Sequence, residues 1–298
     1  MKGWIIAAIV LIAAGGILFT GVMFGLQWDF TKLSTTRFLT NEYAVTEKFT
    51  DIRIVGDTAD ISILPSEDGK VKVVCREQEK LLHAVEVKDG VLHIERQDTR
   101  HWTDFIGISF EKTSVTVYLP VDTYGKLSIR LSTGDVFIDK HYTFTDVDLE
   151  CSTGDVCLQD TAASSLSVKV TTGKVKVDCA KIQGEVFVKV STGEATLNDV
   201  ICGAFASKGN TGDLTLENVI ASGKMEIERS TGDVMLEKCD AAVLEIETDT
   251  GDVKGSLLSD KVFLVETDTG RVSVPHSTSG GRCEVSTDTG DIQLTLAK

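Results

Sequence analysis

The sequence predicts an all-β fold: a single-stranded β-solenoid resembling a right-handed parallel β-helix, preceded by one transmembrane helix. Three observations support this prediction. A Thr-Gly pair recurs nine times at intervals of 19 or 20 residues, apolar and polar residues alternate on both sides of each pair, and a long uncharged run lies near the N-terminus. Repeats of this length are typical of solenoids, in which each repeat buries its apolar face against its neighbours.

Composition narrows the class of protein. The 298 residues are 42% hydrophobic and include 26 Gly and only 3 Pro. That apolar content is too high for a disordered chain, and the glycines lack the three-residue period of collagen. Acidic residues outnumber basic ones by 45 to 30, which gives a formal net charge of -15. We therefore expect no nucleic-acid partner, because phosphate contacts need clustered Lys and Arg.

The N-terminal segment predicts a membrane anchor. Residues 4–26 carry no charge, and a helix of this length reaches about 35 Å, enough to cross a bilayer core. A cleaved signal peptide is the alternative, but the run is longer than a typical signal-peptide core and no A-x-A-like site follows it. We expect residues 1–28 to be a cytoplasmic tip and a single-pass anchor in the cell membrane. Because the N-terminal tail is very short, the C-terminal domain is expected outside the cytoplasm.

Between the anchor and the regular repeat, the sequence predicts a tether and an irregular β cap. Residues 29–46 are expected to be a polar tether. Residues 47–126 contain short alternating runs and are expected to cover the first open coil. A degenerate coil lies inside this cap, where residues 58–63 (Thr-Ala-Asp-Ile-Ser-Ile) match the repeat with Ala59 at the glycine position.

Residues 127–298 are predicted to form nine coils. The residues seven, five and three positions before each corner glycine share one strand face, and 21 of these 27 positions are apolar, which is typical of a half-buried strand. Glycine allows a positive φ at the corner. The rival arrangement is an antiparallel meander or prism with each Thr-Gly at a hairpin tip. The near-fixed period, the identical Thr and the scarcity of Pro favour the solenoid. The corner glycines are Gly134, Gly154, Gly173, Gly193, Gly212, Gly232, Gly251, Gly270 and Gly290.

Acidic residues follow most corner glycines and provide the candidate binding site. Stacked coils would repeat them about every 4.8 Å. One interpretation is structural: turn carboxylates that accept backbone N–H groups. The alternative is a cation ladder, because Ca²⁺ prefers several oxygen ligands. The candidate calcium ligands are Asp249, Asp252, Asp268, Asp288 and Asp291. No other cofactor is expected.

Catalysis is not expected. The five His lie at no repeated spacing, and the chain contains no G-x-S-x-G, H-E-x-x-H or P-loop motif. Seven Cys without a C-x-x-C spacing predict neither zinc nor redox chemistry. The alternative function is a polysaccharide-active β-helix enzyme of the cell envelope, a lyase or hydrolase. Such an enzyme would need a carboxylate-lined groove with Arg or Lys beside it.

One group of polar residues interrupts the apolar face of the repeat. Ser207, Gly209 and Arg229 occupy predicted core positions in neighbouring coils. A buried Arg without a partner costs several kcal/mol. We therefore expect either a bulge in the strand or an acidic partner such as Glu226 or Glu228.

The last coil in the sequence predicts a free edge. Ile292, Leu294 and Leu296 supply its apolar face, and no capping unit follows them. Unpaired strand edges are templates for further strands. We expect this end to dock onto a partner or another copy of the chain.

These segments together resemble a known bacterial family. A single N-terminal span, the strand end at residues 118–120 (Tyr-Leu-Pro), residues 127–136 (Leu-Ser-Ile-Arg-Leu-Ser-Thr-Gly-Asp-Val) and the following repeats are similar to membrane-anchored β-strand-repeat proteins described as candidate adhesins. Some relatives belong to envelope-stress operons such as the Lia type of Gram-positive bacteria. The resemblance covers about residues 45–298 and implies a non-enzymatic role in cell-envelope adhesion, scaffolding or stress sensing. The expected partners are the membrane, an envelope protein or wall polymer, and another copy end to end.

Overall fold

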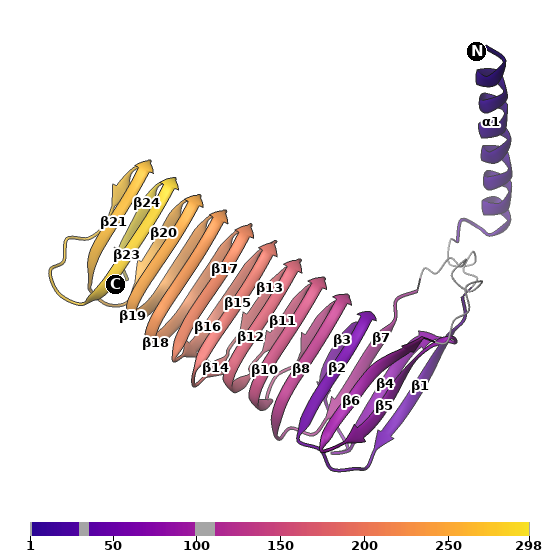
Figure 1. The fold of residues 1–298 in the computed structure, drawn as a ribbon, viewed down its shortest axis with the longest axis horizontal. Helices are drawn as coiled ribbons and strands as arrows, with labels where there is room; N and C mark the ends of the chain where they lie inside the picture. The colour runs from indigo at the N-terminus through magenta and orange to yellow at the C-terminus, as the bar shows by residue number, and fades with distance from the viewer. Residues whose placement is uncertain (1, 30–35, 99–110, 298) are drawn as a thin grey trace.

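A computed structural model describes residues 2–29, 36–98 and 111–297. It contains one N-terminal helix, α1 (Lys2–Gly25), and an elongated β-solenoid (Figure 1). The predicted fold class is confirmed. Within α1, residues Gly3–Gly25 are long and apolar enough to cross a membrane, and all of them except the buried Met23 are exposed. A helix of this length and composition suits a membrane anchor and a signal peptide alike.

Two long rows of paired strands, described here as two sheets, extend along the solenoid (Figure 1). Strands that lead into the corners form the first sheet, in the spatial order β5 (Leu81–Lys88), β6 (Val91–Asp98), β2 (Asp51–Thr58), β8 (Thr123–Thr133), β10 (Thr143–Thr153), β12 (Ala162–Thr172), β15 (Glu185–Thr192), β17 (Ala204–Thr211), β18 (Leu214–Thr231), β19 (Val234–Thr250), β23 (Gly281–Thr289) and β21 (Lys261–Thr269).

Strands that leave the corners form the second sheet, in the spatial order β1 (Phe38–Val45), β4 (Val71–Gln78), β7 (Ser114–Leu119), β3 (Asp60–Pro65), β9 (Val136–Ile138), β11 (Val156–Gln159), β13 (Val175–Asp178), β16 (Ala195–Cys202), β18, β19, β20 (Val253–Leu257), β24 (Ile292–Leu296) and β22 (Val272–Ser273). The long strands β18 and β19 bend and contribute to both sheets. A short third side includes β14 (Lys181–Ile182).

Equivalent positions of successive coils stack in register, as the repeat predicts. Thr133 is paired with Thr153, and Thr153 with Thr172, in parallel ladders. All nine corner glycines have a φ between 123° and 158°. A Cβ on Gly154 would lie only 2.0 Å from the carbonyl oxygen of Gly134. The corner therefore needs glycine for its backbone conformation and also for the close approach of the neighbouring coil.

The alternating residues fill the interior. Leu127, Ile129, Val168 and Val188 are all at most 1% exposed. One continuous core runs from the cap to β24. No single coil could bury this face alone, so stability depends on contacts between neighbouring levels.

The spatial order of the coils departs from the sequence order at both ends. At the N-terminal end, the level formed by β2 and β3 lies between β8/β9 and the outer level β6/β7. At the C-terminal end, β23/β24 lies between β19/β20 and the outer level β21/β22. The expectation that the last coil of the sequence forms the free edge is therefore wrong. Ile292 and Leu294 are buried inside the stack.

The tether expected over residues 29–46 is corrected for residues 38–45, and residues 30–35 lie outside the described part of the chain. Residues 38–45 form β1, which pairs antiparallel with β4 along its whole length. The side chains of Tyr43 and Val45 pack against the core, and this burial makes the segment part of the cap. The degenerate coil is in the stack as predicted, with Thr58 beside Thr133 and Ile61 beside Val136.

Candidate functional site: the corner ladder and the free end

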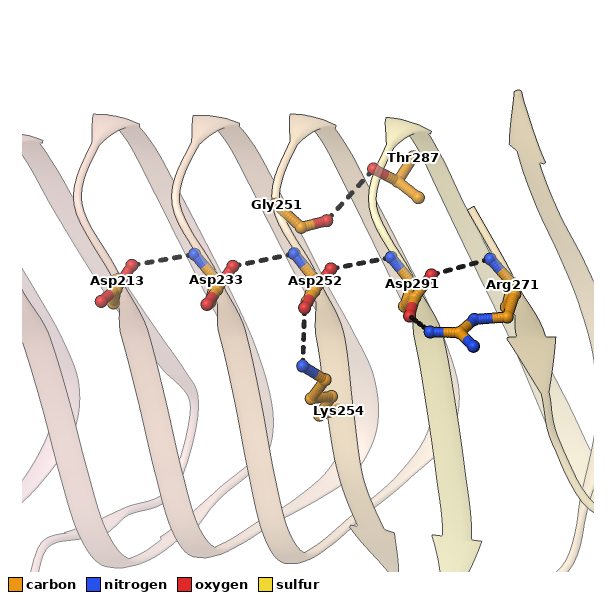
Figure 2. A network of polar contacts seen from close by, with 8 residues as sticks. All are labelled: Asp213, Asp233, Gly251, Asp252, Lys254, Arg271, Thr287 and Asp291. Atoms are coloured by element: carbon orange, nitrogen blue, oxygen red, sulfur yellow. Dashed lines mark hydrogen bonds and ion pairs between the residues drawn. The ribbon is translucent and has the colours of Figure 1, made fainter. Parts of the chain in front are cut away.

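The acidic column at the corners forms a hydrogen-bonded ladder, here called the corner ladder (Figure 2). An Oδ1 atom of Asp213 accepts the backbone N–H of Asp233 at 2.9 Å, and that of Asp233 accepts the N–H of Asp252 at 2.8 Å. Asp252 and Asp291 repeat the contact, at 2.7 Å to Asp291 and 2.9 Å to Arg271. These carboxylates thus have the structural role of turn residues that satisfy backbone donors.

A second segment of the corner ladder lies nearer the cap. Asp60, Asp135 and Asp155 accept the backbone N–H of the next level at 3.0, 2.9 and 2.8 Å. The segment ends at Lys174, because a lysine side chain has no acceptor. The Lys174 ammonium instead pairs with Glu194 at 2.9 Å. The ladder is therefore divided in two where the acidic column is interrupted.

Basic side chains offset the charge of the distal ladder segment. The Lys254 Nζ atom lies 2.6 Å from the Oδ2 atom of Asp252, and the Arg271 Nη2 atom lies 3.2 Å from the Oδ2 atom of Asp291 (Figure 2). The hydrogen bond from Lys254, together with the N–H of Asp291, lowers the pKa of Asp252. The same pairing raises the pKa of Lys254. Asp252 therefore stays ionised at neutral pH.

The structure does not bring the five candidate calcium ligands together as one ligand set. Asp252 and Asp291 already use both carboxylate oxygens, and Asp249, Asp268 and Asp288 are exposed. Across residues 2–29, 36–98 and 111–297, the one group of at least three His, Cys, Asp or Glu ligands close enough to share a metal lies in the cap and contains no aspartate. Calcium binding at the ladder stays a prediction.

The outermost level, β21/β22, forms the free end of the solenoid. β21 is paired with β23 along one edge, and its other edge has no neighbour among the strands that the structure describes. Leu264 is 50% exposed and Val272 46% exposed, while Phe263 and Val265 are only partly buried although they occupy inward positions. Large apolar groups therefore surround an open strand edge, which is a surface suited to association.

A buried lysine fastens this free end to the solenoid. Lys261, the first residue of β21, is 2% exposed. Its ammonium lies 2.5 Å from Asp240 Oδ1 and donates to the carbonyl of Ala241 at 2.7 Å. It reaches them past Gly281, where a Cβ would be 3.5 Å from the lysine Cδ atom. Burial alone would raise the pKa of Asp240, but the hydrogen bonds from Lys261 and Ser259 lower it. This contact stabilises the reversed order of the last two coils.

The partner of Arg229 is not the expected carboxylate. Arg229 is 4% exposed, and its Nη2 atom donates to the Ser207 hydroxyl at 2.7 Å. Glu226 and Glu228 pair with lysines instead. A Cβ at Gly209 would lie 1.5 Å from Arg229 Nη1, so the missing side chain provides the space for the guanidinium. Burial lowers the pKa of Arg229 to about 10.

A groove of about 510 Å³ lies where the cap meets the solenoid, and it contains both carboxylates and cations. Asp60 is paired with Lys112 at 3.5 Å and also bonds the N–H of Asp135. Arg96 is paired with Asp57. The groove thus has the composition that a polysaccharide enzyme needs, but these charged groups already have structural partners.

Comparisons with known proteins agree with the fold. The family model described as Toastrack DUF4097 matches residues 49–295. A candidate adhesin from Bacteroides fragilis NCTC 9343 is similar over 87% of this chain and 97% of its own, at 18% identity and a TM-score of 0.51. A candidate adhesin and a candidate lipid-binding protein, both from Parabacteroides distasonis ATCC 8503, each match 88% of this chain and 98% of their own at 12% identity, with TM-scores of 0.45 and 0.44. Comparison with curated proteins gives no match. At 18% identity, the Bacteroides structure shows a common fold alone.

Proposed function

The chain belongs to the Toastrack DUF4097 family, and from this premise we propose that it is a non-enzymatic adhesion or scaffolding protein of the cell envelope. In this proposal α1 holds the chain at the membrane, and the free end of the solenoid binds a protein partner outside the cytoplasm. The observation that supports it best is the open edge of β21 with its exposed apolar side chains. The candidate adhesin with the same fold is consistent with this role.

The two ends of the solenoid suit different tasks. β1, the first strand after α1, lies in the cap, whereas β21 lies at the opposite end of the stack (Figure 1). The cap closes the end that follows the anchor, and the many in-register levels keep β21 away from it. A binding edge at that position reaches a partner beyond the membrane surface.

The chemistry of the free end indicates what kind of segment it binds. An extended segment added to β21 would hydrogen bond to the unpaired backbone groups of its outer edge. Val262 and Leu264 would contact alternate apolar side chains, because successive residues of a strand face opposite sides. Glu266 and Asp268 on the same strand are exposed and favour Lys or Arg in the partner. We therefore propose a partner segment that is extended, apolar and basic.

Substitutions at exposed positions test the binding edge without disturbing the core. Full-length protein in detergent is used as bait for envelope fractions, in its wild-type form and as Leu264→Lys, with Ile201→Lys as the matched control. Ile201 is 55% exposed and lies in β16, in the middle of the solenoid. We expect Leu264→Lys to reduce capture of the partner at least about tenfold, since a charge on an edge opposes strand addition. Equal capture by wild type and Leu264→Lys would overturn the edge as the binding surface.

Sedimentation of the same variants distinguishes a foreign partner from a second copy. If the captured partner is another copy of the chain, wild type forms a concentration-dependent dimer and Leu264→Lys stays monomeric. If wild type is monomeric at high concentration, end-to-end association is excluded and the partner is a different protein.

The enzyme alternative is tested at the groove between cap and solenoid. Purified full-length protein is incubated with cell-wall polysaccharide, and new reducing or unsaturated chain ends are measured. We expect none. Products that disappear in Asp60→Asn would replace the binding proposal with a catalytic one.

The proposed orientation is tested by the cysteines. Cys179 is exposed, whereas five of the seven cysteines are buried and Cys157 is partly buried. A membrane-impermeant thiol reagent added to intact cells should label the wild type and react much less with Cys179→Ser. Labelling that requires permeabilised cells would place the solenoid on the cytoplasmic side.

A further inference from the structure

Three side chains with metal-binding atoms meet in the interior of the cap, away from the free end. Cys75 and Glu77 are on the same face of β4, and the tight turn into β5 brings His83 beside them. Cys75 and Glu77 are fully buried, and His83 is 4% exposed. One candidate ligand atom from each residue lies within 4.8 Å of the other two.

Hydrogen bonds from neighbouring groups hold this cluster in position. The amide of Asn41 in β1 donates to Glu77 Oε1 at 2.7 Å. Glu77 Oε2 accepts the backbone N–H of His83 at 2.6 Å and lies 2.6 Å from the Nδ1 atom of the same residue. The Tyr43 hydroxyl donates to the His83 carbonyl at 3.2 Å. Contacts of this kind orient metal ligands in proteins.

The thiol of Cys75 has no hydrogen-bond partner among the contacts of the described residues, although it is fully buried. Cys151, Cys202 and Cys239, which are also buried, each donate to a backbone carbonyl at 3.3 to 3.8 Å. Buried Cys283 has no such bond either, but it lies outside any group of candidate metal ligands in the described residues. A buried polar group that lies near a Glu–His pair and has no partner of its own points to a ligand shared by all three.

The donor set identifies the class of ligand. One sulfur, one imidazole nitrogen and one carboxylate oxygen are typical of Zn²⁺ sites and are unlike the all-oxygen sites of Ca²⁺. We propose that Cys75, Glu77 and His83 bind Zn²⁺ and so fasten β4 to β5 in the cap. Metal–ligand distances of about 2.0 to 2.3 Å require the Glu77–His83 contact to open by about 1 Å when the ion enters. The thiol proton and the proton shared by Glu77 and His83 leave to solvent.

Cobalt provides a direct test, because a Co²⁺–thiolate bond has its own charge-transfer absorption. The full-length chain is prepared in a Cys157→Ser/Cys179→Ser background, which removes the two more accessible thiols, and is treated with chelator before Co²⁺ is added. We expect one equivalent to bind with a thiolate band that Zn²⁺ then abolishes. Cys75→Ser should lose the band. Cys283→Ser removes an equally buried thiol outside the cluster and should keep it.

A weaker substitution keeps the test decisive if Cys75→Ser does not fold. Asn41→Ala leaves all three ligands in place but removes the hydrogen bond to Glu77, and should weaken metal binding about 10- to 100-fold while the thiolate band remains. The proposal is overturned if the Cys157→Ser/Cys179→Ser protein binds no Co²⁺, or if the band survives when Cys75→Ser is added to it. In either case the cluster is a buried, hydrogen-bonded Glu–His pair beside a free thiol.

Discussion

The order of the levels is rearranged in the same way at both ends of the solenoid, but further strands cover only one end. The first level in the sequence, β2/β3, lies one place inside the second, β6/β7, which is outermost. In the same way, the last level in the sequence, β23/β24, lies one place inside the level before it, β21/β22. The N-terminal outer level, β6/β7, is covered by the antiparallel strands β5, β4 and β1. The C-terminal outer level, β21/β22, has no such cover in the described chain.

The exposed fractions of inward-facing residues in the two outer levels show how differently the two ends are covered. Leu92 in β6 and Val115 in β7 are both 0% exposed, whereas Val272 in β22 is 46% exposed. Reversing the order of the coils gives each terminal level a neighbour on both sides, but it does not cover the level outside it. One end of the solenoid is therefore covered by further strands of the chain, whereas the other keeps an uncovered edge in the described residues.

The largest expected effect is a difference in stability loss when a core residue is truncated in each of the two outer levels. Leu92→Ala creates a cavity in a fully buried site and should destabilise the protein by about 3 kcal/mol. Val265→Ala, at a partly buried site in β21, should cost only about 1 kcal/mol. Denaturant unfolding of the full-length chain measures both values. Equal losses would mean that the free end is covered in solution and would contradict the asymmetry.

The second prediction concerns the lysine that fastens the free end. Lys261→Met keeps the aliphatic stem but removes the ammonium from Asp240 and Ala241, and we expect it to destabilise the outer level by about 2 kcal/mol. The full cost of an unpaired buried charge is not expected, because the Asp240 side chain is 23% exposed and can be solvated. Hydrogen exchange should quicken in β21 and stay unchanged in β6, since solenoid levels are coupled mainly to their neighbours.

The sequence predicts the regular levels well because each depends on local signals. The Thr-Gly corner and the alternating apolar residues are repeated in every coil, and the register follows from aligning them. Their arrangement at the ends is different. The coils that contain Gly270 and Gly290 have the same pattern, so periodicity cannot tell which is outermost. The signals are single residues: Leu264 is apolar at an outward position, and Lys261 is a charged residue that is buried beside Asp240.

Residues that meet only in three dimensions were harder to foresee. Gly209 and Arg229 depart from the pattern at equivalent positions of neighbouring coils, and this pairing of a missing side chain with an oversized one is the signal that could have predicted their contact. Cys75, Glu77 and His83 match no metal motif in the sequence. The turn between β4 and β5 brings them together, and the turn is not part of the repeat.

Acid should loosen the free end before the regular levels. The pKa of Asp240 is lowered in the folded protein from its ordinary value of 3.8, so its ion pair stabilises the fold at every pH above that value. The stabilisation is lost as the pH falls below 3.8 through the folded pKa. Hydrogen exchange of β21 should therefore be constant between pH 7 and pH 5, after correction for intrinsic rates, and rise in stronger acid. Lys261→Met should lack this dependence, and a β21 that responds equally in both proteins would contradict it.

The smallest effect tests the corner ladder near the free end. Asp252→Ala removes the acceptor for the N–H of Asp291 and should cost about 1 kcal/mol, whereas Asp252→Asn keeps an oxygen acceptor, loses only the exposed pairing with Lys254, and should cost less than about 0.5 kcal/mol. Asp135→Ala, which removes the same contact to Asp155 near the cap, is the matched control. If the carboxylates are only turn residues, added Ca²⁺ leaves the unfolding midpoint of the wild type and that of Asp252→Asn each unchanged. A calcium ladder instead predicts that Ca²⁺ raises the midpoint of the wild type alone, because the amide lacks the charge that the ion requires.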